Sequence, residues 1–281
     1  MNSDFICGRF ALDLSSPLVM GIVNVTPDSF SDGGAQSEQL DLAIERGLQM
    51  VEAGAQILDI GGESTRPGSD AVSVEEELRR IIPVIEGLHG AGVPLSIDTF
   101  KPEVMQAALD AGADMINDIY ALRQPGALEV VAKHPNCGIC IMHMEGEPKT
   151  MQQSPPDYGG EITLAVKQFL QERIDTLLKY DIDSSRVMLD PGFGFGKTVA
   201  QNYQLLNELA ELKSLELPLL IGLSRKSMIG AVVAKEPKER VIGSVVAAMA
   251  AADRGAVVLR VHDVVETADA LAVWRAIHHE E

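Results

Sequence analysis

Short, almost wholly apolar runs alternate along the whole chain with longer segments in which apolar residues recur at helical spacing. Few polar residues interrupt the short runs, which is typical of parallel strands that are covered on both faces. Eight such runs are candidate strands: Val19–Val23, Gln56–Ile60, Leu95–Ile97, Met115–Asn117, Gly138–Met142, Val187–Leu189, Leu219–Gly222 and Val257–Val261.

The segments between these runs have the period of amphipathic helices. Two sets of apolar residues each share one helical face: Leu40, Ile44, Leu48 and Val51 in the first helix, and Val166, Leu170, Ile174 and Leu177 in the longest. The triplet Ala-Gly-Ala occurs at 53–55 and 111–113, where a glycine can end a helix before the next strand. Strands that are each followed by a helix predict a (β/α)8 TIM barrel. An open, doubly wound sheet is the alternative.

The start of the chain adds one element to this prediction. The stretch FICGRFALDL, residues 5–14, alternates between apolar and other residues, and we expect a short hairpin that closes the bottom of the barrel. No linker or low-complexity segment interrupts the rhythm, and barrels of about 250 residues often form one domain. We therefore predict a single domain over residues 1–281.

Composition excludes several classes of function. The chain has 41 Asp and Glu against 23 Lys and Arg, a net charge of −18, which disfavours binding to a nucleic-acid backbone. The sequence contains no run of 18 apolar residues, so it predicts no membrane-spanning helix. The first ten residues, MNSDFICGRF, lack the basic and apolar regions of a signal peptide.

The cysteines do not suggest a disulfide framework, because their number, three, is odd. Cys137 and Cys140 form a C-x-x-C pair, but the surrounding CGICIM has the pattern of a strand. Residues three apart in a strand point to opposite faces. We interpret both as core residues rather than as a metal or redox pair, and we expect a reducing cytoplasmic location.

Polar residues gather where the predicted strands end, and the active sites of such barrels lie at this end. Residues that follow the successive strands are Asn24; Glu63, Ser64, Thr65 and Arg66; Asp98 and Thr99; Asn117 and Asp118; His143; Asp190; Ser224, Arg225 and Lys226; and Arg260 and His262. Any one could cap a helix, and we interpret Asp118 as structural. Their convergence on one rim indicates a binding site.

These residues divide into two chemical groups. Asp98, Asn117 and Asp190 can share hydrogen bonds with a heterocycle that is rich in N–H groups. The side chains that can hold an anion with several oxygens are Arg66, Arg225, Lys226, Arg260 and His262. The pattern predicts a ligand with a donor-rich ring at one end and a phosphate or diphosphate at the other.

The glycine-rich stretch PGFGFGKT, residues 191–198, does not match a nucleotide-binding fingerprint. The first glycine of G-x-x-x-x-G-K-[ST] would fall on Pro191, and G-x-G-x-x-G fails in every register. We expect the glycines to let the backbone bend above the rim. Phe193 and Phe195 would then form one wall of the site and Phe30 another.

With these residues in view, the sequence resembles the dihydropteroate synthase family of the bacterial folate pathway, from about residue 18 to the end. The segments that carry the resemblance are MGIVNVTPDSFSDGG, DIGGESTRPG, SIDTFKPEV, INDI, LDPGFGFGKT, GLSRKSMIG and LRVHDV. The resemblance implies a (β/α)8 barrel that condenses 6-hydroxymethyl-7,8-dihydropterin diphosphate with 4-aminobenzoate, giving 7,8-dihydropteroate and diphosphate.

The resemblance also implies roles for matching residues. The pterin ring would lie against Asp98, Asn117, Asp190 and Lys226. Diphosphate would contact Asn24, Thr65, Arg66, Arg260 and His262, with a Mg²⁺ ion shared between its oxygens and Asn24. The aminobenzoate site would be formed by Phe30, Pro67, Phe195 and Ser224, with Ser224 and Arg225 at the rim.

The chemistry of the substrates suggests an SN1-like path. A dihydropterin can delocalise positive charge, so diphosphate would leave first and the amine would attack afterwards, with charged side chains stabilising both fragments. Closure of the first two loops would exclude water, and Asp32 is a candidate for polarising a water or orienting the amine.

Two other functions compete with this one. A methyltetrahydrofolate–corrinoid methyltransferase has no leaving diphosphate, so Arg260, His262 and the STRPG segment count against it. A non-catalytic pterin-binding paralogue would be expected to lack a loop or a rim cation, and none is missing.

A homodimer is expected from the resemblance and from the small residues of VIGSVVAAMAAADR, residues 241–254. The alternative is that these alanines pack on the barrel's own strands.

Overall fold

Eight parallel strands close into a barrel in the computed structural model, which describes residues 4–26, 36–64, 71–147 and 149–278. The strands are β3 (Leu18–Asn24), β4 (Ile57–Gly61), β5 (Leu95–Asp98), β6 (Met115–Asp118), β7 (Gly138–Met142), β8 (Val187–Asp190), β9 (Leu219–Ile221) and β10 (Ala256–Val261). They pair in chain order, and β10 closes the barrel against β3. The predicted fold class is confirmed, and each strand lies within one residue of its expected position.

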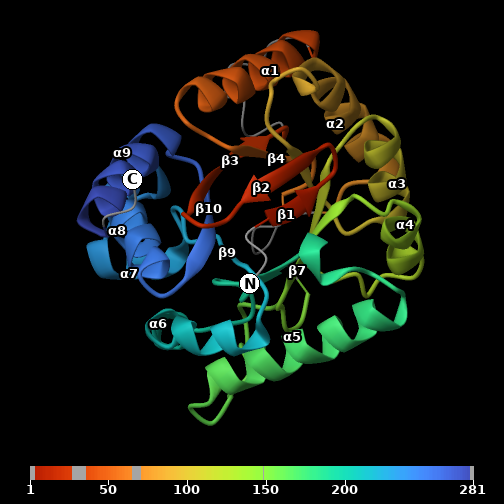
Figure 1. The fold of residues 1–281 in the computed structure, drawn as a ribbon. Helices are drawn as coiled ribbons and strands as arrows, with labels where there is room; N and C mark the ends of the chain where they lie inside the picture. The colour runs from red at the N-terminus through yellow and green to blue at the C-terminus, as the bar shows by residue number, and fades with distance from the viewer. Residues whose placement is uncertain (1–3, 27–35, 65–70, 148, 279–281) are drawn as a thin grey trace.

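Helices surround this barrel (Figure 1). They are α1 (Gln36–Glu52), α2 (Val74–Leu88), α3 (Pro102–Asp110), α4 (Ala127–Lys133), α5 (Ile162–Lys179), α6 (Val199–Asn207), α7 (Ser227–Val233), α8 (Val241–Ala252) and α9 (Val264–His278). Short 3-10 turns occur at η2 (Ser184–Arg186), η3 (Leu209–Leu215) and η4 (Pro237–Glu239). No helix in the described ranges is long and apolar enough to span a bilayer.

Local sequence explains where several helices begin and end. The hydroxyl of Ser73 accepts a hydrogen bond from the backbone N–H of Glu76 at the start of α2. Thr198 and Gln201 form a capping box at the start of α6. Gly54 and Gly112, the central residues of the two Ala-Gly-Ala triplets, adopt φ values of 101° and 102° after α1 and α3, as the sequence predicts.

One predicted helix face is partly wrong. Leu48 was expected on the buried side of α1 but is 42% exposed, while Ala43, Gly47 and Met50 are buried. The reason is close packing between α1 and α2, because a Cβ atom at Gly47 would lie only 2.9 Å from a methyl group of Leu88. In α5 the predicted face is confirmed, since Val166, Leu170 and Leu177 are buried and Ile174 is partly buried.

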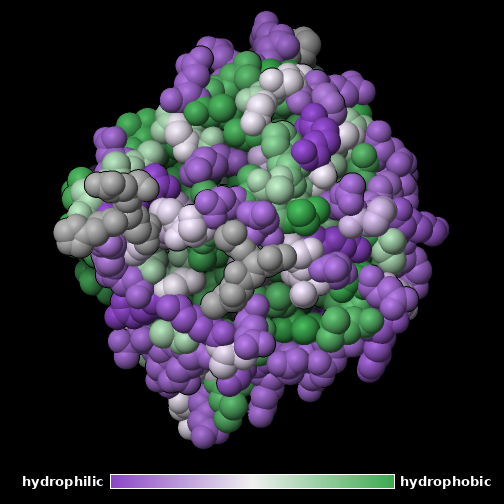
Figure 2. Space-filling model, in the orientation of Figure 1, coloured by the Kyte–Doolittle hydropathy of each residue, from purple (hydrophilic) through white to green (hydrophobic). Residues whose placement is uncertain are grey.

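A hairpin of β1 (Asp4–Cys7) and β2 (Phe10–Asp13) closes one end of the barrel, as predicted. Phe5 and Cys7 are almost wholly buried. They pack against the apolar side chains inside the barrel at the hairpin end, which are Leu18, Met20, Ile57, Met115, Cys140, Met188, Leu220 and Val258. In Figure 1 the hairpin lies in front of the barrel, and the same face in Figure 2 is largely hydrophilic with small apolar patches.

The two cysteines of the C-x-x-C pair lie in different layers of the core. Cys140 belongs to the cluster inside the barrel, and Cys137 to the cluster between strands and helices. All three cysteines of the chain are buried and free. Their assignment as core residues is therefore confirmed, with the physical reason that strand residues three apart face opposite sides.

Candidate active site

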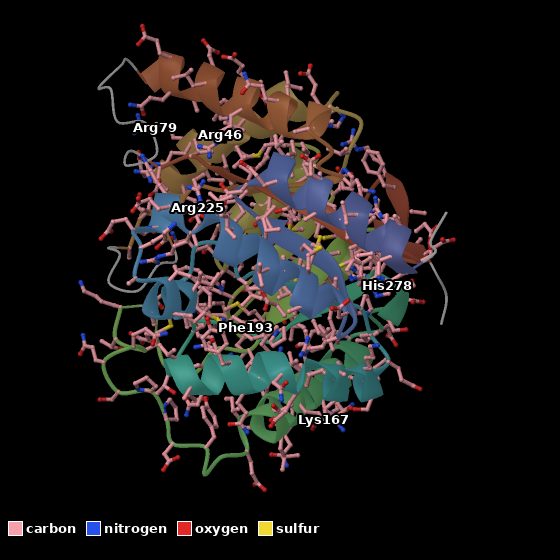
Figure 3. All side chains as sticks on the ribbon, turned by 90° about the vertical axis from the view of Figure 1, so that its left-hand side faces the viewer. Arg46, Arg79, Lys167, Phe193, Arg225 and His278 are labelled. Atoms are coloured by element: carbon pink, nitrogen blue, oxygen red, sulfur yellow. The ribbon has the colours of Figure 1, made fainter. Side chains whose placement is uncertain are left out.

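A pocket opens at the carboxyl end of the strands, opposite the hairpin. Figure 3 views the barrel from the side, with the hairpin at one end and Arg225, which follows β9, towards the other. The pocket encloses roughly 290 Å³ of space that is partly open to solvent. Its lining residues are Asp98, Asn117, Ile119, Met142, Asp190, Phe195, Gly222, Lys226 and Arg260. Six of the predicted site residues thus meet in one cavity.

The base of the pocket contains a charge network that sequence analysis did not identify. Arg260 donates from Nε to Asp59 at 2.6 Å and from Nη2 to Asp98 at 2.7 Å. The Asp59 carboxylate is fully buried and also accepts hydrogen bonds from Ser96 Oγ at 2.6 Å and from Asn117 Nδ2 at 3.3 Å. A signal was present in the sequence, because Asp59 is the only charged residue within the apolar strand ILDIG.

One carboxylate oxygen of Asp98 is left without a hydrogen-bond donor among the described residues. Its Oδ1 atom is buried and has no hydrogen-bond partner among the described residues, while Oδ2 binds Arg260. Burial raises the pKa of Asp98 to about 7, although the Arg260 charge acts in the opposite direction. A ligand that donates a hydrogen bond to Oδ1 would satisfy this oxygen and favour the carboxylate form.

Asp190 and Lys226 form the other charged wall. Asp190 Oδ1 accepts a hydrogen bond from the backbone N–H of Gly192 at 2.7 Å, and burial raises its pKa. Lys226 Nζ donates to the carbonyl oxygen of Phe193 at 2.5 Å and lies 4.8 Å from the centre of the Phe195 ring. Burial lowers the pKa of Lys226 to about 8.

The two phenylalanines of the glycine-rich turn lie in different environments. Phe195 lines the pocket as expected, but Phe193 is fully buried in the core between strands and helices, and Figure 3 labels it within the body of the protein. The prediction of Phe193 as a wall of the site is wrong. The positive φ angles of Gly192, Gly194 and Gly196 break the strand geometry that places residues two apart on one face.

The loop after β9 is tied to the end of β10. Ser224 Oγ accepts a hydrogen bond from the backbone N–H of His262 at 3.1 Å and lies 3.0 Å from His262 Nδ1. Arg225 donates from Nε to Asp263 at 3.0 Å, so a protein carboxylate already neutralises its charge. Of the predicted rim residues, Ser224 and His262 therefore lie side by side, and Arg225 has a partner that sequence analysis did not identify.

The remaining predicted residues are placed in part. Asn24 ends β3 at the pocket end of the barrel. Asp118 accepts backbone hydrogen bonds from Tyr120 and Leu122, both at 2.7 Å, and is structural, as expected. The predicted residues that lie outside the described part of the chain are Phe30, Asp32, Thr65, Arg66 and Pro67.

Comparison with known proteins identifies the family. The family described as "Pterin binding enzyme" matches residues 20–262. The chain belongs to this family.

Within the pterin-binding enzymes, the chain is 49% identical to the dihydropteroate synthase of Escherichia coli K12, over 95% of this chain and 93% of that protein. It is 50% identical to the Haemophilus influenzae enzyme of the same name, over 94% of this chain and 95% of that one. The structure superposes on Xanthomonas albilineans dihydropteroate synthase with 4-aminobenzoic acid, with a TM-score of 0.93, 53% identity and 99% coverage of both chains. The same enzyme in complex with 7,8-dihydropteroate gives a TM-score of 0.86 at 46% identity, again with 99% coverage of both.

These comparisons confirm the resemblance to dihydropteroate synthases that the sequence motifs indicated, and with it the assignment as a transferase.

Proposed function

We propose that the chain condenses 6-hydroxymethyl-7,8-dihydropterin diphosphate with 4-aminobenzoate and releases diphosphate. The observation that carries this proposal is the meeting of Asp98, Asn117 and Asp190 with Lys226 and Arg260 in one pocket at the carboxyl end of the barrel. The relatives bound to 4-aminobenzoic acid and to 7,8-dihydropteroate support the choice of substrate and product.

The pterin ring fits the charged base of the pocket. A pterin carries an aminopyrimidine edge of N–H donors, which matches the free Oδ1 of Asp98 and the carboxylate of Asp190. Lys226 can donate to the ring carbonyl, since its ammonium group lines the same cavity. Phe195 offers an aromatic face for stacking beside it.

The same arrangement supports an SN1-like reaction. The bond between the pterin CH2 group and the diphosphate oxygen breaks first, and positive charge spreads over the dihydropterin ring. Asp98 and Asp190 line the pocket in which the ring would lie, and their carboxylates would stabilise this charge electrostatically. The amine of 4-aminobenzoate then attacks the CH2 carbon, and its nitrogen releases a proton. No covalent enzyme intermediate is needed.

Diphosphate would lie between Arg260, in the charge network at the base of the pocket, and His262 at the rim. Arginine has five N–H donors, and the bonds of Arg260 to Asp59 and Asp98 use two of them. The remaining donors can hold phosphate oxygens without breaking the network.

The residues present also fit a Mg²⁺ ion. Asn24 ends β3 at this rim, where its side-chain oxygen would be a hard ligand for the ion. Mg²⁺ commonly binds through few protein groups together with substrate phosphates. When bound, the ion would neutralise charge on the leaving group.

The test is diphosphate release in the presence of each substrate alone and of both together. Release that requires both substrates supports the proposal. Release with the pterin diphosphate alone would indicate a hydrolase, and binding of the pterin without any release would indicate a non-catalytic binding protein. Transfer from a methylated pterin to a corrinoid would indicate the methyltransferase.

The role of Arg260 has its own test. Arg260→Ala should weaken diphosphate binding and slow the chemical step together, because its contacts strengthen as charge develops on the leaving group. Aminobenzoate binding to this variant at saturating diphosphate and Mg²⁺ should remain nearly normal. A loss of aminobenzoate binding that diphosphate does not restore would place Arg260 on the other substrate.

We further propose a homodimer, on different grounds from the small residues of α8. Those residues face the barrel, since Ser244 and the alanines at 247, 248, 251 and 252 are buried. The outer face instead exposes Ile242 at 76% and Val246 at 63%, and Val265, near the start of the neighbouring α9, is 55% exposed. An apolar surface of this kind fits a second copy of the chain.

Ile242→Glu should give a monomer in sedimentation at micromolar concentration, while Leu178→Glu, at a similarly exposed site on α5, should leave the dimer intact. A monomeric mass for the unaltered protein would contradict the dimer. We also propose a cytoplasmic location, which the free cysteines fit.

A further inference from the structure

A buried lysine lies directly behind the pocket. Lys197 is 2% exposed and does not line the cavity. Its Nζ atom lies 2.8 Å from the carbonyl oxygen of Gly192, 3.1 Å from that of Phe195 and 2.8 Å from His143 Nδ1. Among the described residues no carboxylate forms an ion pair with it. Because a fully buried lysine is rare without a partner, these contacts require a reason.

The contacts match the ammonium form of the side chain. An ammonium group has three hydrogens, and three polar atoms lie within 3.1 Å of Nζ, with the carbonyl oxygen of His143 farther away at 3.4 Å. Burial lowers the pKa of His143 to about 2, so its ring is neutral, and Nδ1 accepts when Nε2 carries the hydrogen. A neutral amine has only two hydrogens, so it keeps all three contacts only where His143 donates from Nδ1 to its lone pair in the other tautomer.

These hydrogen bonds hold the turn at residues 191–196. Four successive carbonyl oxygens of this turn accept from side chains: Gly192 and Phe195 from Lys197, Phe193 from Lys226, and Gly194 from Gln152. Lys226 reaches the turn from the pocket, and Lys197 reaches it from the protein interior. The turn is therefore held between two cations.

The turn also sits tightly on the end of β7. A Cβ atom at Gly192 would lie 1.8 Å from the carbonyl oxygen of His143, so the two backbones are in direct contact. Lys197 spans this contact, because its Nζ binds both the ring of His143 and the carbonyl oxygen of Gly192. The N–H of Gly192 in turn donates to Asp190. A shift of the turn would move three pocket residues at once: Asp190, Phe195 and Lys226.

We propose that Lys197 is a positioning residue for the pterin pocket, fixing the 191–196 turn against His143 and thereby setting the places of Asp190, Phe195 and Lys226. The proposal rests on the proposed function of this pocket. Lys197 itself touches no substrate in this scheme. Its effect falls mainly on the pterin site, to which Asp190 and Lys226 belong, and reaches the expected aminobenzoate site only through Phe195.

The surrounding charges make this device sensitive to pH. Burial lowers the pKa of Lys197 to about 7, and Lys226 acts in the same direction, whereas Asp190 and Glu145 favour the ammonium form. As the pH rises through this value, the side chain loses the charge that strengthens its hydrogen bonds to the carbonyl oxygens of Gly192 and Phe195. Affinity for the pterin substrate should therefore fall above pH 7, and part of this fall should be absent from a variant that lacks the amine.

The experiment compares Lys197→Met with a matched control, Arg186→Met. Arg186 is also a buried cation that donates to backbone carbonyls, those of Cys137 at 2.8 Å and Val131 at 3.2 Å, but it lies before β8 at the opposite end of the barrel. Steady-state rates of diphosphate release and titration with fluorescent 6-hydroxymethylpterin are measured for both variants and the unaltered protein.

Lys197→Met should raise KM for the pterin diphosphate, and Kd for the pterin, by about tenfold or more, the effect of losing a charge-assisted hydrogen-bond network. KM for aminobenzoate at saturating pterin diphosphate should rise by a smaller factor than KM for the pterin diphosphate, since Phe195 alone of the three residues placed by Lys197 belongs to the expected aminobenzoate site. Arg186→Met should lower stability but leave both KM values unchanged. Lys197→Arg, which keeps the cation, should recover part of the pterin affinity.

An unchanged pterin KM in Lys197→Met, or an equal rise in Arg186→Met, would overturn the proposal. If Lys197→Met does not fold, His143→Leu and His143→Asn replace it: Leu removes the acceptor and should raise the pterin KM, whereas Asn retains one and should restore it. Equal KM values in these two variants would also overturn the proposal. Failure of the unaltered protein to release diphosphate would instead overturn the proposed function.

Discussion

The Asp59 carboxylate should hold the base of the pocket together, although it touches no predicted substrate atom. It is fully buried and binds Arg260 Nε at 2.6 Å, Ser96 Oγ at 2.6 Å and Asn117 Nδ2 at 3.3 Å. Asp59→Asn has nearly the same shape but removes the charge. The Arg260 guanidinium would then retain Asp98 as its only charged partner among the described residues.

The size of the effect follows from burial. Removing one partner of a buried ion pair destabilises a protein by roughly 3–5 kcal/mol, because the other charge stays buried and uncompensated. The Arg260 side chain is 19% exposed and keeps Asp98, which places the loss at the lower end, about 3 kcal/mol. Ser96→Ala removes a single hydrogen bond to the same carboxylate and should cost about 1 kcal/mol.

The assay is urea denaturation of the unaltered protein, Asp59→Asn, Arg260→Met and the double variant. Arg260→Met leaves Asp59 and Asp98 without their shared cation, so it should also destabilise the protein. The double variant removes the unpaired charges together, and we expect it to be about 1–3 kcal/mol more stable than the sum of the single losses predicts. A loss below about 1 kcal/mol in Asp59→Asn, or strictly additive losses, would refute this reasoning.

Three further results are expected. Asp190→Ala should weaken pterin diphosphate binding by about 10- to 150-fold in calorimetry, since a charge-assisted hydrogen bond is lost, and unchanged affinity would exclude Asp190 from pterin recognition. Pterin affinity should fall by about tenfold per pH unit below the Asp98 pKa of about 7, because protonation removes the carboxylate; Asp98→Asn should flatten this dependence, and an equally steep profile in that variant would contradict it. His143 has a folded-state pKa of about 2, below its ordinary 6.5, so the unfolded chain binds the extra proton and stability decreases as the pH falls below 6.5. Between pH 7.5 and 5 this site should remove about 2 kcal/mol of unfolding free energy, measured as the difference between the unaltered protein and His143→Asn, and identical pH profiles would refute it.

Several structural features were predictable because their causes are local. Largely apolar runs of three to five residues marked each barrel strand, since strands covered on both faces have few solvent-facing positions for polar residues. Gly54 and Gly112 marked helix ends because the left-handed conformation that they adopt favours glycine. The ends of parallel strands meet at one rim in a closed barrel, so Asp98, Asn117 and Asp190 could be placed together from their order alone.

Other features depended on contacts between distant parts of the chain. The ion pair between Asp59 and Arg260 joins residues 201 positions apart, and a single Asp in an apolar strand does not reveal its partner. Leu48 turned outward because Gly47 allowed α2 to approach, which no pattern within α1 could show.

By itself, the sequence determined the eight-stranded barrel, the hairpin at its base and the ring of polar residues at the strand ends, because period and chain order suffice for each. Only the tertiary structure decided how those polar residues divide their hydrogen bonds. It assigned Arg225 to Asp263, buried Phe193 while leaving Phe195 in the pocket, and placed Lys197 behind the glycine-rich turn. These positions depend on which charged groups lie within hydrogen-bond distance and on how much space the packing leaves. Both are set only when the barrel has closed.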